Sequence, residues 1–425
     1  MFKRVLIANR GEIAVRIIRA CQEMGIETVA VYSDEDADAM HVRLADYSYN
    51  IGPADASESY LNIDALMEAA ERTEADAVHP GYGFLSEDAD FAEMVTKAGM
   101  TWIGPWADTI RKVGDKDEAR AAMIPSGIPM SKGSTPLTSV EDAVEQAKDV
   151  GYPIILKPVA GGGGKGMLIA NSEDDLRNIL TIIDINKVKY YFEHYIEHSR
   201  HIEVQIVADN YGHVIHLGER ECSLQRRNQK LLEESPSIAL TPDRRAEVGA
   251  LAIKAAKSVH YNNIGTVEFL LDLKTNQFNF MEINPRIQVE HGVTEAVTGI
   301  DLVRTQIRIA AGESLDLQQE DVKFTGHAIE CRINAEDPDN NFMPSPGKID
   351  FFLEPGGPRV RVDSGVCAGL SISPYYDSLI AKIVVRGRTR GDAIKIMRRA
   401  LNEFKVGGIK TTIPLHQRIL KNEYF

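Results

Sequence analysis

The chain has 425 residues, of which 44% are hydrophobic, so we expect two or three domains with full apolar cores and exclude a disordered protein. A formal net charge of −14 argues against nonspecific nucleic-acid binding, and no apolar run reaches the roughly 18–20 residues that cross a bilayer. Four scattered cysteines without metal-ligand spacing exclude a disulfide framework and a structural zinc site.

The first part of the chain alternates short apolar strands with amphipathic helices. Strands are predicted at 5–8, 28–32, 77–79 and 101–103, with a helix at 13–21. The first apolar run turns polar at Asn9, too early for a signal-peptide core, so we expect a buried strand and a cytoplasmic protein. This alternation predicts a parallel sheet covered on both faces, with ligands in the loops after its strands.

A glycine-rich hairpin is the main feature of the next part, a predicted lid at about 130–203. Apolar strands at 152–157 and 167–170 flank the run from Gly161 to Gly166. A dinucleotide motif needs a helix after its glycines, and in a Walker A loop Ser or Thr would follow Lys165, so both are excluded. The run predicts either a flap whose backbone amides and lysine bind phosphate or a mobile surface hairpin.

The remaining part, from 204 to the end, mixes strands and helices. Strands are predicted at 202–207, 266–271 and near 382–385, and a helix at 244–259. The segment 219–230 is rich in charge and has little apolar periodicity, which favours a solvated face over a core element. Cys222 within it has no histidine base nearby in the sequence, so we do not assign it as a nucleophile.

Two glutamates, Glu268 and Glu282, each interrupt an otherwise apolar predicted strand. A buried carboxylate is unfavourable unless it is paired or bound to a metal. Together with Asn284, they offer hard oxygen ligands suited to Mg²⁺ held against substrate phosphates. The alternative is a pair of strand-edge glutamates that face water.

The densest polar cluster runs from Asn284 to His291. Alternation along an extended segment places Arg286, Gln288 and Glu290 on one side. Such a face predicts either a site that binds and deprotonates a small planar oxyanion or a surface ladder of salt bridges. The cluster alone does not separate these two interpretations.

Eight segments, taken in order, resemble the biotin carboxylase family and cover essentially the whole chain. They are 7–13, 79–86, the glycine run, 200–205, 225–230, 286–291, 330–338 and 374–377. Each motif is weak alone, but eight in register are specific. The resemblance implies an α/β (overall α+β) ATP-grasp fold with a Rossmann-like parallel sheet in an N-terminal domain, a small glycine-flap lid and a larger mixed C-terminal domain. The expected limits are 1–113 for the N-terminal domain, 114–312 for the ATP-grasp domain and 326–425 for the C-terminal domain.

The resemblance also implies a ligase that uses ATP and Mg²⁺ or Mn²⁺. It would activate bicarbonate as carboxyphosphate and then carboxylate N1′ of biotin on a carrier protein. The implied partners are a biotin carboxyl carrier protein, a carboxyltransferase subunit and a second copy in a homodimer, with no nucleic acid and no membrane. The sequence contains no Met-Lys-Met biotinylation segment, so we expect the carrier and the carboxyltransferase outside this sequence. The acceptor (acetyl-CoA as in fatty acid biosynthesis, propionyl-CoA or pyruvate) would belong to the carboxyltransferase.

Individual roles follow from the same resemblance. The implied catalytic residues are Arg286, Glu290, Lys230 and Arg332, with Glu290 as the base for bicarbonate and Arg332 as the cation beside ionised biotin. The implied bicarbonate and biotin site adds Gln288 and Val289, and the implied metal ligands are Glu268, Glu282 and Asn284. The implied ATP contacts are Lys116, Lys157, Gly163, Gly164, Lys165, Gly166, Glu193, His194, Tyr195, Ile196, His201, Gln225, Asn228, Glu268, Leu270 and Glu282.

The sequence departs from the family pattern at four positions. Leu168 replaces a basic residue, His194 a lysine, Pro285 a threonine and Gly292 a proline, and the lid is about six residues short before Tyr191. None of these changes removes a residue implied in phosphoryl transfer, so we expect activity to survive.

Two other functions are compatible with an ATP-grasp fold. A carbamoyl-phosphate or amino-acid ligase is disfavoured by the block from Arg286 to His291, because those enzymes need a different acceptor site. A non-catalytic nucleotide-binding assembly subunit would be indicated by loss of Lys230, Arg286 or Glu290, and all three are present. The strand after the glycines excludes a NAD-dependent dehydrogenase.

Overall fold

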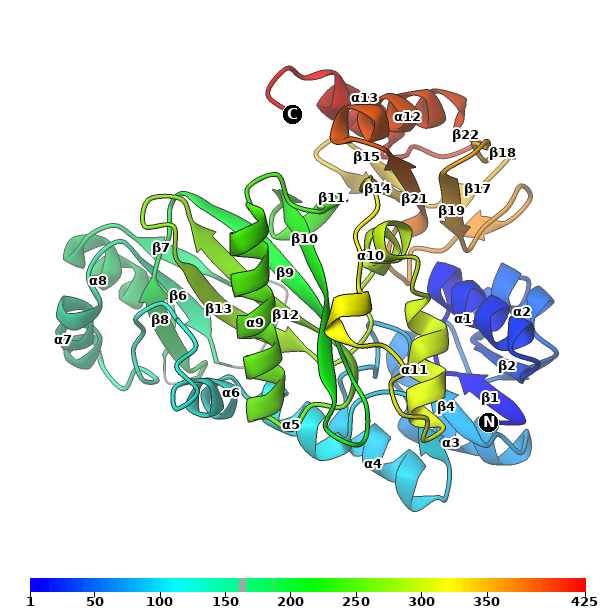
Figure 1. The fold of residues 1–425 in the computed structure, drawn as a ribbon, viewed down its shortest axis with the longest axis horizontal. Helices are drawn as coiled ribbons and strands as arrows, with labels where there is room; N and C mark the ends of the chain where they lie inside the picture. The colour runs from blue at the N-terminus through cyan, green and yellow to red at the C-terminus, as the bar shows by residue number, and fades with distance from the viewer. Residues whose placement is uncertain (160–165, 186) are drawn as a thin grey trace.

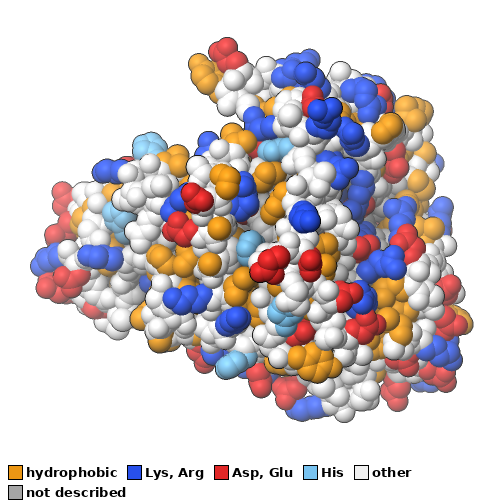
Figure 2. Space-filling view, viewed as in Figure 1, with side chains coloured by type: hydrophobic (Ala, Val, Ile, Leu, Met, Phe, Trp, Pro, Cys, Tyr) orange, Lys and Arg blue, Asp and Glu red, His pale blue; other side chains and the backbone are white. Residues whose placement is uncertain are grey.

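The computed structural model describes residues 1–159, 166–185 and 187–425. Figure 1 shows a lid and an N-terminal part on opposite sides of a large central sheet, with the C-terminal helices at one end of that sheet. Lys and Arg side chains gather over the C-terminal helices in Figure 2, so the net charge of −14 is not spread evenly. Within the described ranges, the helices are too short or too polar to cross a membrane.

The N-terminal part is the parallel sheet that the strand–helix alternation predicts, with strand order β3-β2-β1-β4-β5. Its strands are β1 Arg4–Ile7, β2 Glu27–Tyr32, β3 Tyr47–Asn50, β4 Ala77–His79 and β5 Thr101–Trp102. Its helices are α1 Gly11–Glu23, α2 Met40–Leu44, α3 Ile63–Arg72, α4 Ala89–Lys97 and α5 Ala107–Gly114. The sequence did not predict β3, because this edge strand is polar and mostly exposed and carries no apolar signal.

The lid is built on a three-stranded antiparallel sheet in the order β7-β6-β8. Its strands are β6 Ile154–Pro158, β7 Leu168–Ala170 and β8 Tyr190–His194, and its helices are α7 Val140–Val150 and α8 Glu173–Ile182. The helix α6 Lys116–Met123 precedes the lid and packs against α5 and against α9 Pro242–Ser258. Leu156, Leu176 and Phe192 are fully buried in a core of its own. Strands β6 and β7 form the predicted hairpin, whereas Gly163, Gly164 and Lys165 lie outside the described residues.

The central sheet has eight antiparallel strands in the order β13-β12-β9-β10-β11-β14-β21-β19. Its strands are β9 Ser199–Ala208, β10 Val214–Arg226, β11 Gln229–Ser235, β12 Asn263–Asp272, β13 Phe278–Asn284, β14 His327–Asn334, β19 Val360–Ser364 and β21 Leu379–Gly387. Helices α9 Pro242–Ser258 and α10 His291–Thr298 cover it, and α11 Leu302–Ala310 follows α10. The sheet therefore continues from the ATP-grasp region into the C-terminal region without a break.

The charged segment 219–230 is only partly a solvated face. Ser223 and residues 227–229 are exposed, but residues 219–222 are buried, so the prediction was wrong for this first part. Most of it belongs to β10, near the middle of the central sheet, where Glu219 and Arg220 are fully buried. Glu219 pairs with Arg245 of α9 at 2.8 Å, while Arg220 donates to Thr294 of α10, so these neighbours point to opposite faces. The sequence shows that these residues are charged but does not show which groups they pair with. Here the paired groups on α9 and α10 make burial of the charges possible.

The C-terminal part packs α12 Arg390–Glu403 and α13 Ile413–Lys421 beside strands β14 and β21. Short strands complete it: β15 Glu336–Asp337, β16 Met343–Pro344, β17 Gly347–Lys348, β18 Phe351–Leu353, β20 Ser371–Ile372 and β22 Lys405–Gly407. Three single 3₁₀ turns are found in the described chain, at Asp34–Asp36, Ala56–Glu58 and Gln319–Asp321. This arrangement confirms the mixed character predicted for the last part of the sequence.

Candidate functional site

Acidic and basic side chains from neighbouring strands of the central sheet meet at one site. Glu268 on β12 is the register partner of Glu203 on β9 and of Glu282 on β13, which sets three acids across three strands. Lys230 lies at the start of β11, and Arg332 lies on the adjacent strand β14. The sheet register therefore collects side chains that are far apart in the sequence.

Lys230 is the hub of this site. Its Nζ donates to Glu268 Oε1 at 2.9 Å, to Glu290 Oε1 at 2.7 Å and also to Glu203 Oε2. Burial alone would lower the pKa of Lys230, but these three carboxylates outweigh burial and raise it well above the usual range. The ammonium is therefore charged at neutral pH and holds the three acids together.

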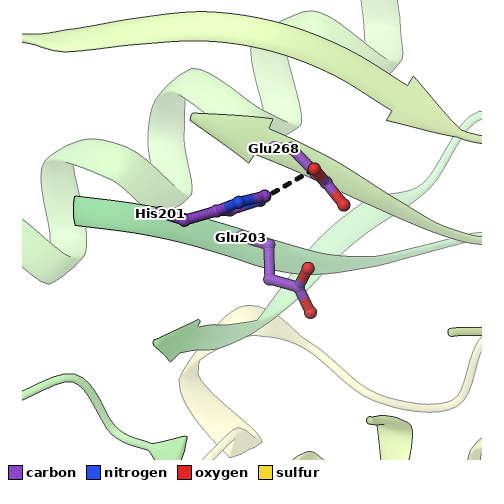
Figure 3. Close-up of side chains that lie close together, drawn as sticks. All are labelled: His201, Glu203 and Glu268. Atoms are coloured by element: carbon purple, nitrogen blue, oxygen red, sulfur yellow. Dashed lines mark ion pairs between the residues drawn. The ribbon is translucent and has the colours of Figure 1, made fainter. Parts of the chain in front are cut away.

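His201 extends this network along β9. Figure 3 shows its ring directed at Glu268, with His201 Nε2 at 2.7 Å from Glu268 Oε2 and Glu203 beside them. The Glu268 carboxylate raises the pKa of His201, although burial lowers it. Gln225 donates from Nε2 to the other ring nitrogen across 2.9 Å. The Lys230 ammonium bonds to both Glu203 and Glu268, so a side chain of the protein supplies the positive charge between these two carboxylates.

The predicted metal ligands fit a divalent cation at the outer edge of the site. Glu282 is exposed on the edge strand β13, whereas Glu268 is buried. The alternative interpretation, a pair of strand-edge glutamates that face water, therefore describes Glu282 but not Glu268. Asn284 donates from Nδ2 to Glu268 Oε1 at 3.1 Å. The pKa of Glu282 is raised, first because the surrounding protein reduces the hydration of its carboxylate, and then because the Glu268 and Glu87 carboxylates repel it. Crowded oxygen donors of this kind suit a hard cation, which would relieve their repulsion.

The segment 285–290 coils instead of extending, so the predicted alternation was wrong in its geometry. Arg286 Nη1 donates to Gln288 Oε1 at 2.8 Å, and Arg286 Nε pairs with Glu87 Oε1 at 2.8 Å. Gln288 Nε2 in turn lies 3.4 Å from Glu268 Oε1. The arginine and the amide thus stay beside the acidic cluster through side-chain contacts rather than through a shared strand face.

Glu290 occupies the N-cap position of α10 and is fully buried. Besides Lys230, it accepts a hydrogen bond from Arg332 Nη2 at 2.9 Å, while Arg332 Nε donates to Glu233 Oε1 at 2.6 Å. Burial alone would raise the pKa of Glu290, but Lys230, Arg332 and Arg220 lower it well below the usual range. The helix N-terminus favours the same negative charge. Glu290 is therefore an ionised carboxylate that is shielded from water and paired with cations.

The lid residues with predicted nucleotide contacts form a second group. Lys157 Nζ and Arg120 Nη1 bond to the two oxygens of Glu193, at 2.6 and 2.8 Å. The Lys116 ammonium stands 6.0 Å from the centre of the Tyr191 ring. His194 Nδ1 lies 3.0 Å from the Gly151 carbonyl oxygen.

The remaining predicted nucleotide contacts lie on strands or in the links between them. Tyr195 and Ile196 link β8 to β9, and Leu270 on β12 is the register partner of His201. Asn228 lies in the turn between β10 and β11 with a positive φ of 65°, and Gly166 directly follows Lys165, the last residue of the segment 160–165 that the structure does not describe.

Sequence reasoning missed three residues of the site, Glu203, Arg220 and Glu233, all fully buried. Glu203 interrupts an apolar strand, as Glu268 does, so the same signal was available for it, whereas Glu233 lies in the mixed strand β11 beside Glu234 and gives no such signal. Cys222 lies close to Glu203 and Glu290, and its thiol pKa is raised well above its usual range by burial, so it stays protonated. That agrees with not assigning it as a nucleophile.

Three family profiles match the chain in succession. Residues 1–110 match Biotin carboxylase, N-terminal domain; residues 115–318 match Carbamoyl-phosphate synthase L chain, ATP binding domain; and residues 330–425 match Biotin carboxylase C-terminal domain. Biotin carboxylase 1 of Bacillus subtilis (strain 168) is 55% identical over 432 residues, covering 100% of this chain and 96% of that protein.

Solved structures agree with these matches. A biotin carboxylase from Campylobacter jejuni in a β-γ-ATP complex has a TM-score of 0.96 at 46% identity, covering 100% of this chain and 96% of that one. The biotin carboxylase domain dimer of the Hydrogenobacter thermophilus 2-oxoglutarate carboxylase, with MgADP, ADP and bicarbonate, has a TM-score of 0.95 at 48% identity and covers 100% and 94%. The likeness extends over the whole chain in each comparison.

Proposed function

This chain belongs to the biotin carboxylase family, and we propose how its residues divide the work of that family's reaction. It is an ATP-grasp ligase that carboxylates biotin with bicarbonate, using ATP and Mg²⁺, within a biotin-dependent carboxylase. One observation carries the assignment of roles: a fully buried, ionised carboxylate, Glu290, lies between the cations Lys230 and Arg332.

Glu290 is the base in this proposal. Bicarbonate is a weak nucleophile, so its proton must leave as its oxygen attacks phosphorus. The O–H proton moves to the Glu290 carboxylate, the freed oxygen bonds to the γ-phosphorus of ATP, and the bond to ADP breaks, which gives carboxyphosphate and ADP. Arg286 and Gln288 lie together beside this base and would hold the planar anion, with Val289 next to them.

The nucleotide would lie between the lid and the acidic edge of the central sheet. Lys116 and Lys157 supply positive charge from the lid side, and Glu268, Glu282 and Asn284 would hold Mg²⁺ or Mn²⁺ on the other side. When bound, the metal offsets the negative charge of the transferring phosphoryl group. The Lys230 ammonium adds a fixed positive charge between the metal ligands and the base.

Arg332 is the proposed biotin-facing residue. Its side chain is 16% exposed beside two acids that are fully buried, so it forms the open side of the catalytic cluster. An arginine keeps its charge at any ordinary pH, which suits a residue that stabilises biotin ionised at N1′.

We further propose a homodimer whose biotin arrives on a carrier protein and whose carboxyl group passes to a carboxyltransferase. A solved relative that forms a dimer supports the homodimer. The domain limits 1–113, 114–312 and 326–425 remain our proposal. We also propose a cytoplasmic location, which the four unpaired cysteines favour.

ADP release with Mg²⁺, bicarbonate and free biotin tests the catalytic assignment. We expect ATP hydrolysis that requires bicarbonate, rises with biotin and collapses in Glu290→Gln. Glu71→Gln, an exposed position on α3, is the matched control and should retain full activity. ADP release indifferent to bicarbonate, or unchanged in Glu290→Gln, would contradict the proposal.

A further inference from the structure

Arg332 is shared by two buried carboxylates, and only one of them has a role so far. Its Nε donates to Glu233 Oε1 at 2.6 Å and its Nη2 to Glu290 Oε2 at 2.9 Å. A third acid, Glu330, precedes Arg332 on β14 and is the register partner of Glu233 on β11. All three carboxylates are fully buried.

Of the facing pair, the Glu233 carboxylate accepts a hydrogen bond from Arg332, whereas the Glu330 carboxylate accepts none within the part of the chain that the structure describes. Among the described residues, neither oxygen of Glu330 has a hydrogen-bond partner, and Glu233 Oε2 has none either. Lys382 and Arg332 act to lower the pKa of Glu330, but Lys382 donates its hydrogen bond to the Val289 carbonyl oxygen, at 2.5 Å. Two facing buried carboxylates cannot both ionise readily, because like charges repel strongly where water is excluded.

The environment decides which acid of the pair takes the charge. Burial raises the pKa of Glu330 well above its usual range, and Glu233 and Glu290 add to that effect. Burial raises the pKa of Glu233 only to about 7, because Arg332 lowers it while Glu290 raises it further. Within the described parts of the chain, the charged or titratable groups that interact with Glu233 are Lys230, Arg332, Glu290, Glu330, Cys222 and Cys331. Glu330 is thus the uncharged member, and Glu233 is the one that pairs with Arg332.

This sharing has a consequence during the proposed reaction. When Glu290 takes the bicarbonate proton, it loses the charge that holds Arg332 through Nη2. The same proton removes the repulsion that Glu290 exerts on Glu233, so Glu233 ionises more readily at that moment. Arg332 then keeps one ionised partner at Nε, while its Nη groups become available to a ligand on the open side.

We propose that Glu233 is the positioning residue of Arg332, anchoring the guanidinium through Nε so that its Nη groups face biotin once Glu290 is protonated. The proposal rests on the proposed function, because it presupposes that Glu290 is the base and that Arg332 serves biotin. It assigns a role to a buried carboxylate on β11, which β9 and β10 separate from the strands of the metal ligands.

Glu233→Leu and Glu233→Gln test the anchor, with Glu330→Gln as the matched control on the facing strand. Bicarbonate-dependent ADP release without biotin measures the first step, and carboxybiotin formed per ADP, with KM and kcat for free biotin, measures the second. In Glu233→Leu we expect the first step to persist, whereas kcat/KM for biotin falls roughly tenfold to a hundredfold, the range for loss of one charge-assisted hydrogen bond. Glu233→Gln keeps an acceptor for Nε and should recover part of that loss.

Glu330→Gln should behave like the unchanged chain, because an amide imitates an uncharged carboxyl group of the same shape. Equal loss of both steps in Glu233→Leu would indicate a structural role and overturn the proposal. A Glu330→Gln variant as impaired as Glu233→Leu, or a Glu233→Leu variant with normal biotin kinetics, would overturn it too. If the unchanged chain showed no bicarbonate-dependent ADP release, the proposed function itself would fail, and the two failures are thereby distinguishable.

Discussion

Arg220→Met removes a fully buried cation of the central sheet. The Arg220 guanidinium is fully buried and donates to Glu203 and to Gln205 Oε1, Thr294 Oγ1 and Thr266 Oγ1, the last three at 2.6, 3.0 and 3.0 Å. Methionine approximates its volume but leaves one Glu203 oxygen without a cation.

The size of the loss follows from these contacts. Breaking a buried ion pair costs about 3–5 kcal/mol, and because Lys230 still holds Glu203 we expect the low end, about 3 kcal/mol. With an unfolding entropy of about 2.1 cal/mol/K per residue over 425 residues, that loss lowers the Tm by about 3 °C.

Thermal and urea unfolding followed by circular dichroism measure this effect. Arg72→Met, an exposed position at the end of α3, is the control and should leave stability unchanged. In the double variant Arg220→Met with Glu203→Gln, part of the loss should be recovered, because no unpaired charge remains. Full stability in Arg220→Met, or strictly additive losses in the double variant, would refute the reasoning.

Three further predictions concern charge and packing. Lys230→Met should raise the pKa of Glu290 by removing the nearest cation, so the acid limb of the bicarbonate-dependent ATPase profile should move to higher pH; an unmoved limb contradicts this. Arg361 and Lys382 outweigh burial and lower the pKa of Asp363 from 3.8 to about 2, so Asp363 contributes about 2 kcal/mol that is present above pH 4 and lost as pH falls towards 2. Urea unfolding at several pH values should show this loss, and Asp363→Asn should remove it; an unchanged pH dependence in that variant would refute the assignment. Gly292→Ala places a Cβ 2.9 Å from both Glu330 Oε2 and Val384 Cγ2, so it should cost about 1–3 kcal/mol in urea unfolding, whereas Gly356→Ala meets no atom within 4 Å and should not.

The sequence predicted the strand and helix order well, because apolar alternation and glycine positions are local signals. The N-terminal parallel sheet and the hairpin at β6 and β7 are confirmed, whereas β3 was missed because a polar edge strand has no apolar pattern. The buried charges were the main failure. Arg220 and Glu219 were expected in water because their partners, Glu203 and Arg245, are known only once strands and helices are packed.

In the candidate site too, features that depend on one segment were predicted correctly, and features that depend on contacts between distant segments were not. Glu268 was singled out correctly as a buried carboxylate, because a charge inside an apolar strand is visible in one segment. The extended geometry assumed for Arg286, Gln288 and Glu290 was wrong, since Glu290 ends a turn and caps α10. Their convergence depends on Lys230, which comes from another strand and bonds to Glu290 and Glu268 together.

The position of the base depends on both the N-terminal part and the C-terminal strands of the molecule. The Val289 carbonyl, directly before Glu290, accepts from Lys382 of β21, and Lys382 also pairs with Glu12 of α1 in the N-terminal part at 3.2 Å. Tyr82, after β4, donates its hydroxyl to Glu12. Since Lys382 is fully buried, neither partner can be exchanged for water without leaving a charge unpaired. The N-terminal sheet and the C-terminal strands therefore fix the peptide that carries the base, although neither supplies the base itself.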